Sequence, residues 1–172
     1  MSRVILITGG ARSGKSSYAQ RIAKENGGKR AFIATAVTTD EEMRERILRH
    51  KEERGKDFFT YEEPEKIAAL LKEIINKYEI ILVDCLTFFI SNLLIKGLTD
   101  EEIYKECDLI LERLSGSNST VIFVSNEVGM GIVPDNALAR RFRDIAGRVN
   151  QKFANSSDEV YLIVSGIPLK IK

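Results

Sequence analysis

A glycine-rich segment near the start of the chain carries the strongest chemical signal in the sequence. Residues 9–16 fit the pattern G-x-x-x-x-G-K-[ST], in which backbone N–H groups surround the phosphates of a nucleotide at the start of a helix. Lys15 is expected to contact the β- and γ-phosphates, and Ser16 to offer its hydroxyl to Mg²⁺. The candidate phosphate-binding residues are therefore Gly9, Gly10, Ala11, Arg12, Ser13, Gly14, Lys15 and Ser16.

Asp84 is the second candidate for phosphate chemistry. It ends a strongly apolar run, as does the carboxylate that holds Mg²⁺ together with the loop hydroxyl in phosphate-loop enzymes. The alternative is that Asp84 only caps the helix expected after it. We take Ser16 and Asp84 as candidate metal ligands.

His50 is the only histidine, and it lies in a highly charged segment. On a helix, Arg46 and Arg54 would lie four residues to either side of it on the same face. Neighbouring cations favour the neutral, nucleophilic imidazole and can hold a phosphate. By itself, however, a single histidine on a charged helix is more typical of a solvated residue than of a catalytic one.

Two further features have open roles. Glu62 could contact a ribose or a metal, although nothing beside it in the sequence indicates either. Residues 126–131 read Asn-Glu-Val-Gly-Met-Gly and follow an expected strand, so they form either a plain loop or a substrate contact.

Composition narrows the class of protein. A chain of 172 residues with 44% hydrophobic content predicts one domain, residues 1–172, with a substantial core. The 26 basic and 25 acidic residues give no reason to propose a nucleic acid or an anionic membrane as partner. No apolar run reaches the length of a membrane span, the first strand begins without a signal peptide, and Cys85 and Cys107 fit no zinc spacing. These features predict a cytoplasmic protein with reduced thiols.

The elements that position these residues follow from hydrophobic spacing and turn signals. Strands are expected at residues 3–8, 30–35, 79–84, 120–124, 160–164 and 169–171, with a short, extended segment at 58–62. Helices are expected at residues 16–24, 40–54, 86–95, 99–114 and 135–154, and Pro64 is expected to open one more. Residues 166–168 are expected to join the last two strands.

This alternation predicts a mostly parallel sheet with helices on both faces and an antiparallel strand at its C-terminal edge. In such sheets, ligands bind beyond the carboxyl ends of the strands. The phosphate loop, Asp84 and Asn126 should therefore lie along one rim.

Several segments together resemble the bifunctional adenosylcobinamide kinase / adenosylcobinamide-phosphate guanylyltransferase family of cobalamin biosynthesis. The resemblance covers nearly the whole chain, and its most specific segments are residues 126–134 and 143–151. The other matching segments are residues 8–16, 33–36, 46–47, 50–51, 60–62, 83–87 and 164–168. Relatives often have tryptophan where this chain has Phe58.

The resemblance implies a P-loop NTPase fold of RecA-like type and two reactions. ATP or GTP phosphorylates a hydroxyl of adenosylcobinamide, and GMP is then transferred from GTP to give adenosylcobinamide-GDP and pyrophosphate. His50 occupies the position of the family's guanylyl carrier, and the family suggests a homotrimer. The expected cofactor is the Mg²⁺ assigned above to Ser16 and Asp84. Beyond the phosphate loop, the nucleotide contacts that it implies are Ala34, Thr35, Ala36, Lys51, Glu52, Glu53, Arg54, Glu62 and Asp84.

Two other functions remain open from the residues alone. A kinase of another small molecule would keep the phosphate loop and make His50 incidental. A GTP-dependent switch is less favoured, because the chain has no D-x-x-G after Asp84 and no N-K-x-D motif.

Overall fold

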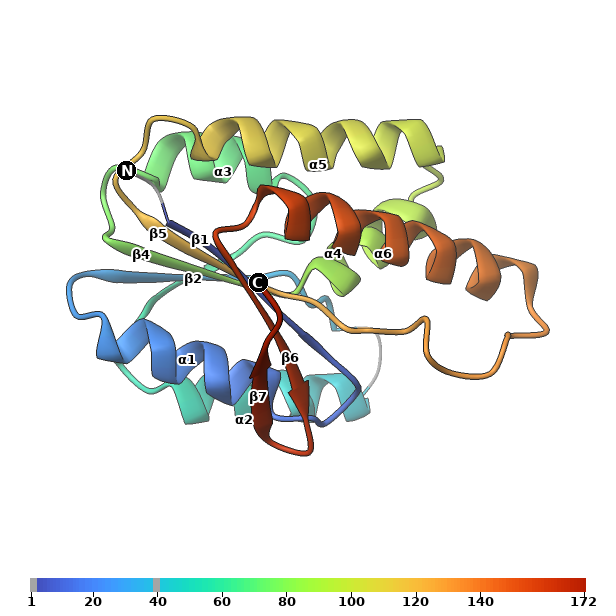
Figure 1. Ribbon diagram of the computed structural model, residues 1–172, viewed down its shortest axis with the longest axis horizontal. Coiled ribbons are helices and arrows are strands. Elements are labelled where there is room, and N and C mark those ends of the chain that lie inside the picture. The colour runs from blue at the N-terminus through green and yellow to red at the C-terminus, as the bar shows by residue number, and fades with distance from the viewer. Residues whose placement is uncertain (1–2, 39–40) are drawn as a thin grey trace.

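The computed structural model describes residues 3–38 and 41–172, and the side chains of Met43, Arg46, His50, Glu53 and Arg54 lie outside that description. The described residues form a seven-stranded sheet in the order β3-β2-β4-β5-β1-β6-β7 (Figure 1). Its strands are β1 (Arg3–Gly9), β2 (Arg30–Ala34), β3 (Phe59–Glu62), β4 (Ile80–Asp84), β5 (Thr120–Val124), β6 (Glu159–Val164) and β7 (Ile167–Lys170). All neighbouring strands pair in parallel except β6 and β7, which are antiparallel.

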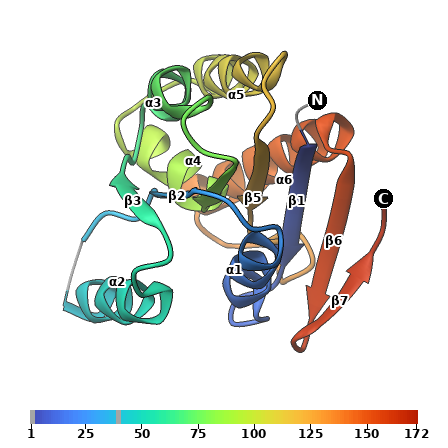
Figure 2. The same cartoon turned by 90° about the vertical axis from the view of Figure 1, so that its left-hand side faces the viewer.

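Helices cover both faces of the sheet. One face carries α1 (Lys15–Glu25) and α2 (Glu41–Arg54) (Figures 1 and 2). The other carries α3 (Ile67–Ile74), α4 (Leu86–Ile95), α5 (Asp100–Leu114) and α6 (Ala137–Ser156). The expected fold class, with its antiparallel C-terminal edge strand, is confirmed. Residues 39 and 40, at the expected start of the second helix, lie outside the described residues.

The central strands are buried because both of their faces are covered by helices. Every residue of β5 after Thr120 is buried, and so are the first four residues of β4. Phe123 of β5 meets Phe153 of α6 edge to face, with ring centroids 4.8 Å apart. This contact fixes the second half of α6 on the sheet, whereas its first half projects past the carboxyl ends of the strands (Figure 1).

Three expected boundaries were wrong, each because a local hydrogen bond or turn decides the boundary. Pro64 does not open α3: the Glu63 carboxylate accepts the N–H groups of Glu65 and Lys66 at 2.9 and 2.7 Å, and the helix begins only at Ile67. Likewise α6 begins at Ala137, because the Asn136 side chain accepts the N–H of Ala139 and caps it.

The third correction concerns the last connection. The turn between β6 and β7 consists of Ser165 and Gly166, both with positive φ, 51° and 82°. Two such residues match the twist of a tight hairpin. Ile167 and Pro168, which were expected in the connection, therefore belong to β7.

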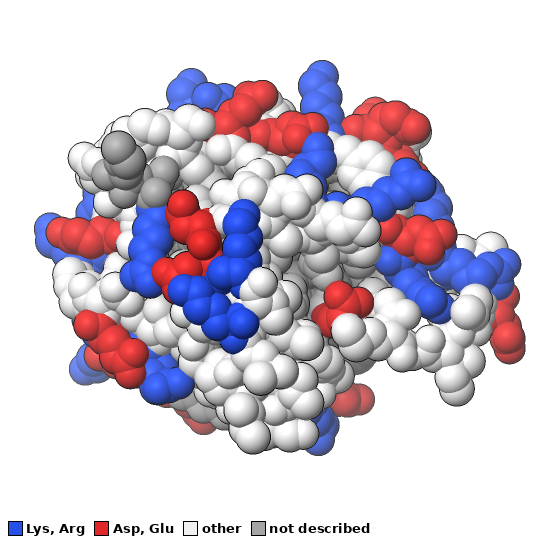
Figure 3. All heavy atoms as spheres, in the orientation of Figure 1, with Lys and Arg blue, Asp and Glu red and all other residues white. Residues whose placement is uncertain are grey.

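No helix within residues 3–38 and 41–172 is long and apolar enough to cross a membrane. Basic and acidic side chains are interspersed over the face seen in Figure 3, without a broad field of one sign. This distribution agrees with the net charge of +1.

Candidate functional site

The phosphate loop leaves the end of β1 and enters α1, as the motif requires. Gly14 stands at the N-cap with φ 95° and has no side chain to cap the first amides of α1. Those N–H groups, together with the helix dipole, favour an anion. Ser16 lies in the first turn of α1 and is half-buried.

Lys15 is buried, with 7% of its surface exposed. Its ammonium folds back over the loop, 2.5 Å from the carbonyl oxygen of Gly10 and 3.5 Å from the Ser13 hydroxyl. The charge is thus held against the same loop whose amides favour phosphate. This is the arrangement expected for a lysine that contacts a phosphate chain.

Neighbouring segments support the loop from two sides. The N–H of Gly166, in the β6–β7 turn, donates to the carbonyl of Ser13 at 2.9 Å. The N–H of Glu127, just beyond β5, donates to the carbonyl of Gly9 at 2.9 Å. A Cβ on Gly9 would lie 2.5 Å from the Ile163 carbonyl oxygen, so only glycine fits there. The loop is therefore held from both neighbouring strands.

Asp84 ends β4, which is separated from β1 by β5 alone. Strands in a sheet lie about 4.8 Å apart, so β1 and β4 are about 10 Å apart. Asp84 is half-buried at the rim. Burial, and then the charge of Asp84, raises the pKa of the adjoining Cys85 thiol to about 11, so this cysteine stays protonated near neutral pH.

Thr35 anchors the neighbouring end of β2. Its hydroxyl donates to the carbonyl of Cys85 and accepts the N–H of Cys85, each at 2.7 Å. The Asn92 side chain donates to the carbonyl of Thr35 at 2.8 Å. Because the side chain of Thr35 is committed to this structural network, residues 34–36 would have to contact a nucleotide largely through other atoms.

The remaining nucleotide candidates lie farther along the rim. From the strand spacing, β2 is about 14 Å and β3 about 19 Å from β1. Glu62, at the end of β3, is exposed and pairs with Lys51 of α2 at 3.7 Å. Glu52 is exposed on the same helix. The side chains of His50, Glu53 and Arg54 lie outside the described residues, but their backbone belongs to α2.

The structure thus sorts the candidate residues into two groups on one rim. The phosphate loop and Asp84 lie near the middle of the sheet, and Lys51 and Glu62 lie near its β3 edge. Residues 34–36 lie between them.

Comparisons with known proteins decide the family. A family model described as cobinamide kinase / cobinamide phosphate guanyltransferase matches residues 5–171. The chain belongs to this family. The bifunctional adenosylcobalamin biosynthesis protein CobU of Escherichia coli K12 is 40% identical over 181 residues, covering 98% of this chain and 99% of that protein.

A second relative agrees with membership of the cobinamide kinase / guanyltransferase family, and one solved structure shares the fold alone. The bifunctional adenosylcobalamin biosynthesis protein CobP of Pseudomonas aeruginosa PAO1 is 41% identical over 167 residues, covering 97% of this chain and 96% of its own. A KaiC-like protein from Pyrococcus horikoshii shares the fold at a TM-score of 0.53 and 13% identity, covering 93% of this chain and 70% of its own.

Sequence reasoning missed a polar network behind the rim. The Thr87 hydroxyl accepts from the N–H and the side-chain amide of Asn126, at 3.1 and 3.0 Å. The Asn150 amide donates to the carbonyl of Asn126 at 3.2 Å, which ties α6 to the rim. A signal was available, since Asn126 and Asn150 both fall within the two most specific family segments.

Proposed function

We propose that the chain catalyses both reactions named for its family. A nucleoside triphosphate, ATP or GTP, first phosphorylates a hydroxyl of adenosylcobinamide. GMP from GTP is then transferred to that phosphate, giving adenosylcobinamide-GDP and pyrophosphate. Two observations support the proposal: the phosphate loop with its buried Lys15, and α2, which contains His50 and whose Lys51 pairs with Glu62 at the end of β3 on the same rim.

In the kinase step, the acceptor hydroxyl oxygen attacks the γ-phosphorus, its proton is released to solvent, and the bond between the γ-phosphorus and the β-phosphate oxygen breaks. Negative charge moves onto the departing diphosphate, beside Lys15 and the amides at the start of α1. Such fixed, preorganised charges stabilise a transition state without reorganising.

In the guanylyl step, a nitrogen of His50 attacks the α-phosphorus and pyrophosphate leaves. The resulting phosphorus–nitrogen bond is broken when an oxygen of the acceptor's phosphate attacks the same phosphorus, which releases His50 unchanged. This covalent route divides one difficult displacement into two easier ones.

The position of α2 bears on this route. Within the described chain, α2 does not pack extensively against another helix, and Figure 2 shows it set apart from α1. Its end is marked by Gly55, with φ 61°, and the Lys51–Glu62 ion pair joins it to β3. We propose that α2 shifts relative to the sheet to bring His50 to a nucleotide whose outer phosphates lie on the loop.

Ser16 and Asp84 fit a magnesium ion bound together with phosphates. Mg²⁺ is usually held by one or two carboxylates, with waters and phosphate oxygens completing its shell. The half-buried carboxylate of Asp84 and the half-buried hydroxyl of Ser16 on the rim match this type of coordination. When bound, the ion would neutralise charge on the phosphates.

The family resemblance extends the proposal to a homotrimer. Apolar side chains are exposed on the loop before α6, where Met130 is 80% and Ile132 96% exposed. Ile167 and Leu169 on β7 are also exposed. Such surfaces support self-association, and sedimentation would measure its stoichiometry.

The proposal is tested by incubating the protein with adenosylcobinamide, GTP and Mg²⁺ and separating the products by chromatography. The native protein should yield the phosphate and then the GDP derivative. His50→Ala should accumulate the phosphate only, and Lys15→Ala should form neither. Formation of the GDP derivative by His50→Ala would overturn the assignment of the carrier.

A further inference from the structure

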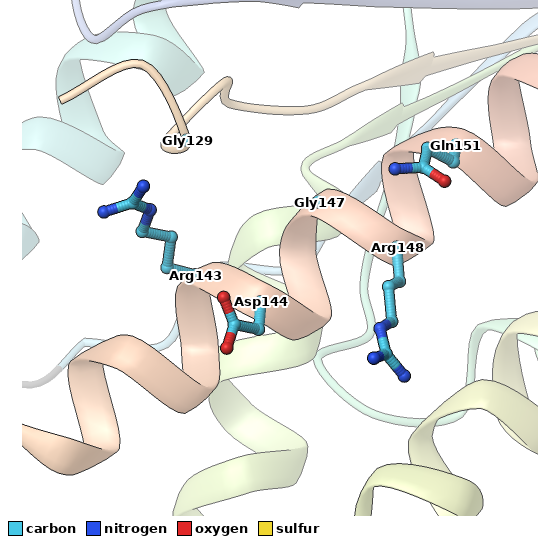
Figure 4. A pocket seen from close by; sticks show the side chains of 6 residues that line it. All are labelled: Gly129, Arg143, Asp144, Gly147, Arg148 and Gln151. Carbon is cyan, nitrogen blue, oxygen red and sulfur yellow. The ribbon is translucent and has the colours of Figure 1, made fainter. Parts of the chain in front are cut away.

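A depression of about 440 Å³ lies between the glycine-rich loop and α6 (Figure 4). It is lined by Gly129, Arg143, Asp144, Gly147, Arg148 and Gln151. A Cβ on Gly147 would meet nothing within 4 Å outside its own stretch of helix, so this glycine leaves space open. None of the lining residues belongs to the nucleotide contacts proposed above.

The arginines of α6 divide into two pairs. Arg140 donates to the carbonyl of Pro134 at 2.9 Å, and Arg141 pairs with Asp100 at 2.7 Å, so both hold the structure together. Within the described chain, Arg143 and Arg148 form no ion pair, and both line the depression. Their charges are available to a ligand.

Arg143 gives the more specific indication. Its guanidinium points towards Gly129 across the depression (Figure 4). One guanidinium nitrogen, Nη1, is buried and has no hydrogen-bond partner among the described residues. A buried, unpaired donor on a charged group is costly, so this nitrogen favours an acceptor oxygen supplied from outside the chain.

The depression adjoins the phosphate loop. Glu127 donates to Gly9 of that loop, and Gly129 follows only two residues later, at most about 7 Å along the chain. Lys51 and Glu62 lie farther out on this same β5 side of β1, but α6 covers the opposite face of the sheet from α1 and α2 (Figure 2). A molecule in the depression would therefore face the phosphate loop without overlapping the residues proposed for the nucleotide.

We infer that this depression is the acceptor pocket and that it binds the phosphomonoester of the acceptor substrate, with Arg143 as its principal contact. The inference rests on the proposed function, in which the acceptor gains a phosphate in the first reaction and presents it in the second. A guanidinium donates two parallel hydrogen bonds to a phosphate. Arg148, which is exposed and points away from Gly129, supplies a second and weaker attraction (Figure 4).

The test separates the acceptor's phosphate from the phosphates of GTP. The covalent intermediate in which His50 carries GMP (enzyme–GMP) is formed with α-labelled GTP and isolated. Transfer of the label to adenosylcobinamide phosphate is then measured. In Arg143→Ala, the KM for adenosylcobinamide phosphate should rise about tenfold or more, as expected for the loss of a charged hydrogen bond. Enzyme–GMP formation, and the KM for unphosphorylated adenosylcobinamide, should change by less than about threefold. In Arg143→Lys, the KM for adenosylcobinamide phosphate should lie between those of the native protein and Arg143→Ala.

A second variant fills the pocket without removing a charge. Gly147→Leu places a side chain in the open space and improves helix propensity, so the protein should fold normally. It should impair transfer to adenosylcobinamide phosphate while leaving enzyme–GMP formation intact. Arg113→Ala, on an exposed arginine at the end of α5, is the matched control and should behave as the native protein.

Unchanged transfer in both Arg143→Ala and Gly147→Leu would overturn the pocket assignment. A changed sedimentation coefficient of either variant, together with the loss of enzyme–GMP formation, would also overturn the assignment. That result would instead assign this face of α6 to contacts between copies of the chain. If the native protein forms no enzyme–GMP, the proposed function fails instead. Equilibrium dialysis with adenosylcobinamide phosphate then tests the pocket alone, and equal binding by native protein and Arg143→Ala would refute it.

Discussion

Replacing Gly9 with alanine should damage both the stability and the nucleotide binding of this protein. An added Cβ would lie 2.5 Å from the carbonyl oxygen of Ile163 and 2.8 Å from the Ser13 hydroxyl. The first contact cannot be relieved by a side-chain rotation, because Gly9 and Ile163 are partners in the β1–β6 register. Either strand β6 or the phosphate loop has to move.

The expected cost follows from the packing. Overpacking a close-packed site costs about 1–3 kcal/mol, and a contact with backbone belongs at the upper end of that range. For a chain of this length, each kcal/mol lowers the Tm by about 2–4 °C, so a loss of about 3 kcal/mol predicts a decrease of roughly 6–12 °C. Because the loop is displaced, GTP should also no longer raise the Tm as it does for the native protein.

The neighbouring glycine supplies a matched control. A Cβ on Gly10 would meet nothing within 4 Å, so Gly10→Ala should change the free energy of unfolding by less than about 0.5 kcal/mol. Thermal and urea unfolding of both variants, with and without GTP, measure the difference. Equal stability of Gly9→Ala and Gly10→Ala would refute the packing described for the phosphate loop.

Three further predictions concern buried and half-buried polar groups. Hydrogen bonds from Lys170, Tyr161 and Arg3 lower the pKa of Glu159 from 4.5 to about 2. Their contribution, about 3 kcal/mol, is present above pH 4.5 and is lost as the pH falls towards 2. Urea unfolding should therefore show Glu159→Gln less stable than the native protein at pH 7, with the difference vanishing near pH 2; a constant difference would contradict this. Thr35→Val removes both hydrogen bonds to Cys85 and should lower the free energy of unfolding, measured in urea, by about 2–4 kcal/mol. The control Thr38→Val, at an exposed threonine, should change it little, and an equal loss in both variants would argue against the network. Burial raises the pKa of Cys85 to about 11 and that of Cys107 to about 12. Neither thiol should react with a thiol reagent at pH 8 until urea is added, and rapid reaction in the native protein would be the opposite result.

The layout of the fold was predictable because its signals are local. The apolar run of β4, the phosphate-loop glycines and the Thr99–Glu102 capping box of α5 each act over a few residues. Their alternation along the chain was enough to predict a parallel sheet. The wrong boundaries at Pro64, Asp135 and Ile167 came from single hydrogen bonds or turn conformations that sequence patterns do not resolve.

The site was predictable only in part. Motif spacing located the phosphate loop and Asp84 on one rim, because parallel strands place their carboxyl ends together. It could not place Glu62 next to Lys51, since that depends on β3 standing at the far edge of the sheet. Nor could it find the unpaired nitrogen of Arg143, because α6 meets the loop beyond β5 only in the folded chain. The roles of His50 and of the residues that accompany it stay predictions.

The central claim is that His50 carries GMP taken from GTP held on the phosphate loop. It is tested most directly by incubating native protein and His50→Ala with GTP labelled at the α- or the γ-phosphate and measuring protein-bound label. The native protein should retain α-label, up to one GMP per chain, in a bond that is stable to base and labile to acid, and should retain no γ-label. His50→Ala should retain neither. Base-stable, acid-labile α-label on His50→Ala at the native level would contradict the account.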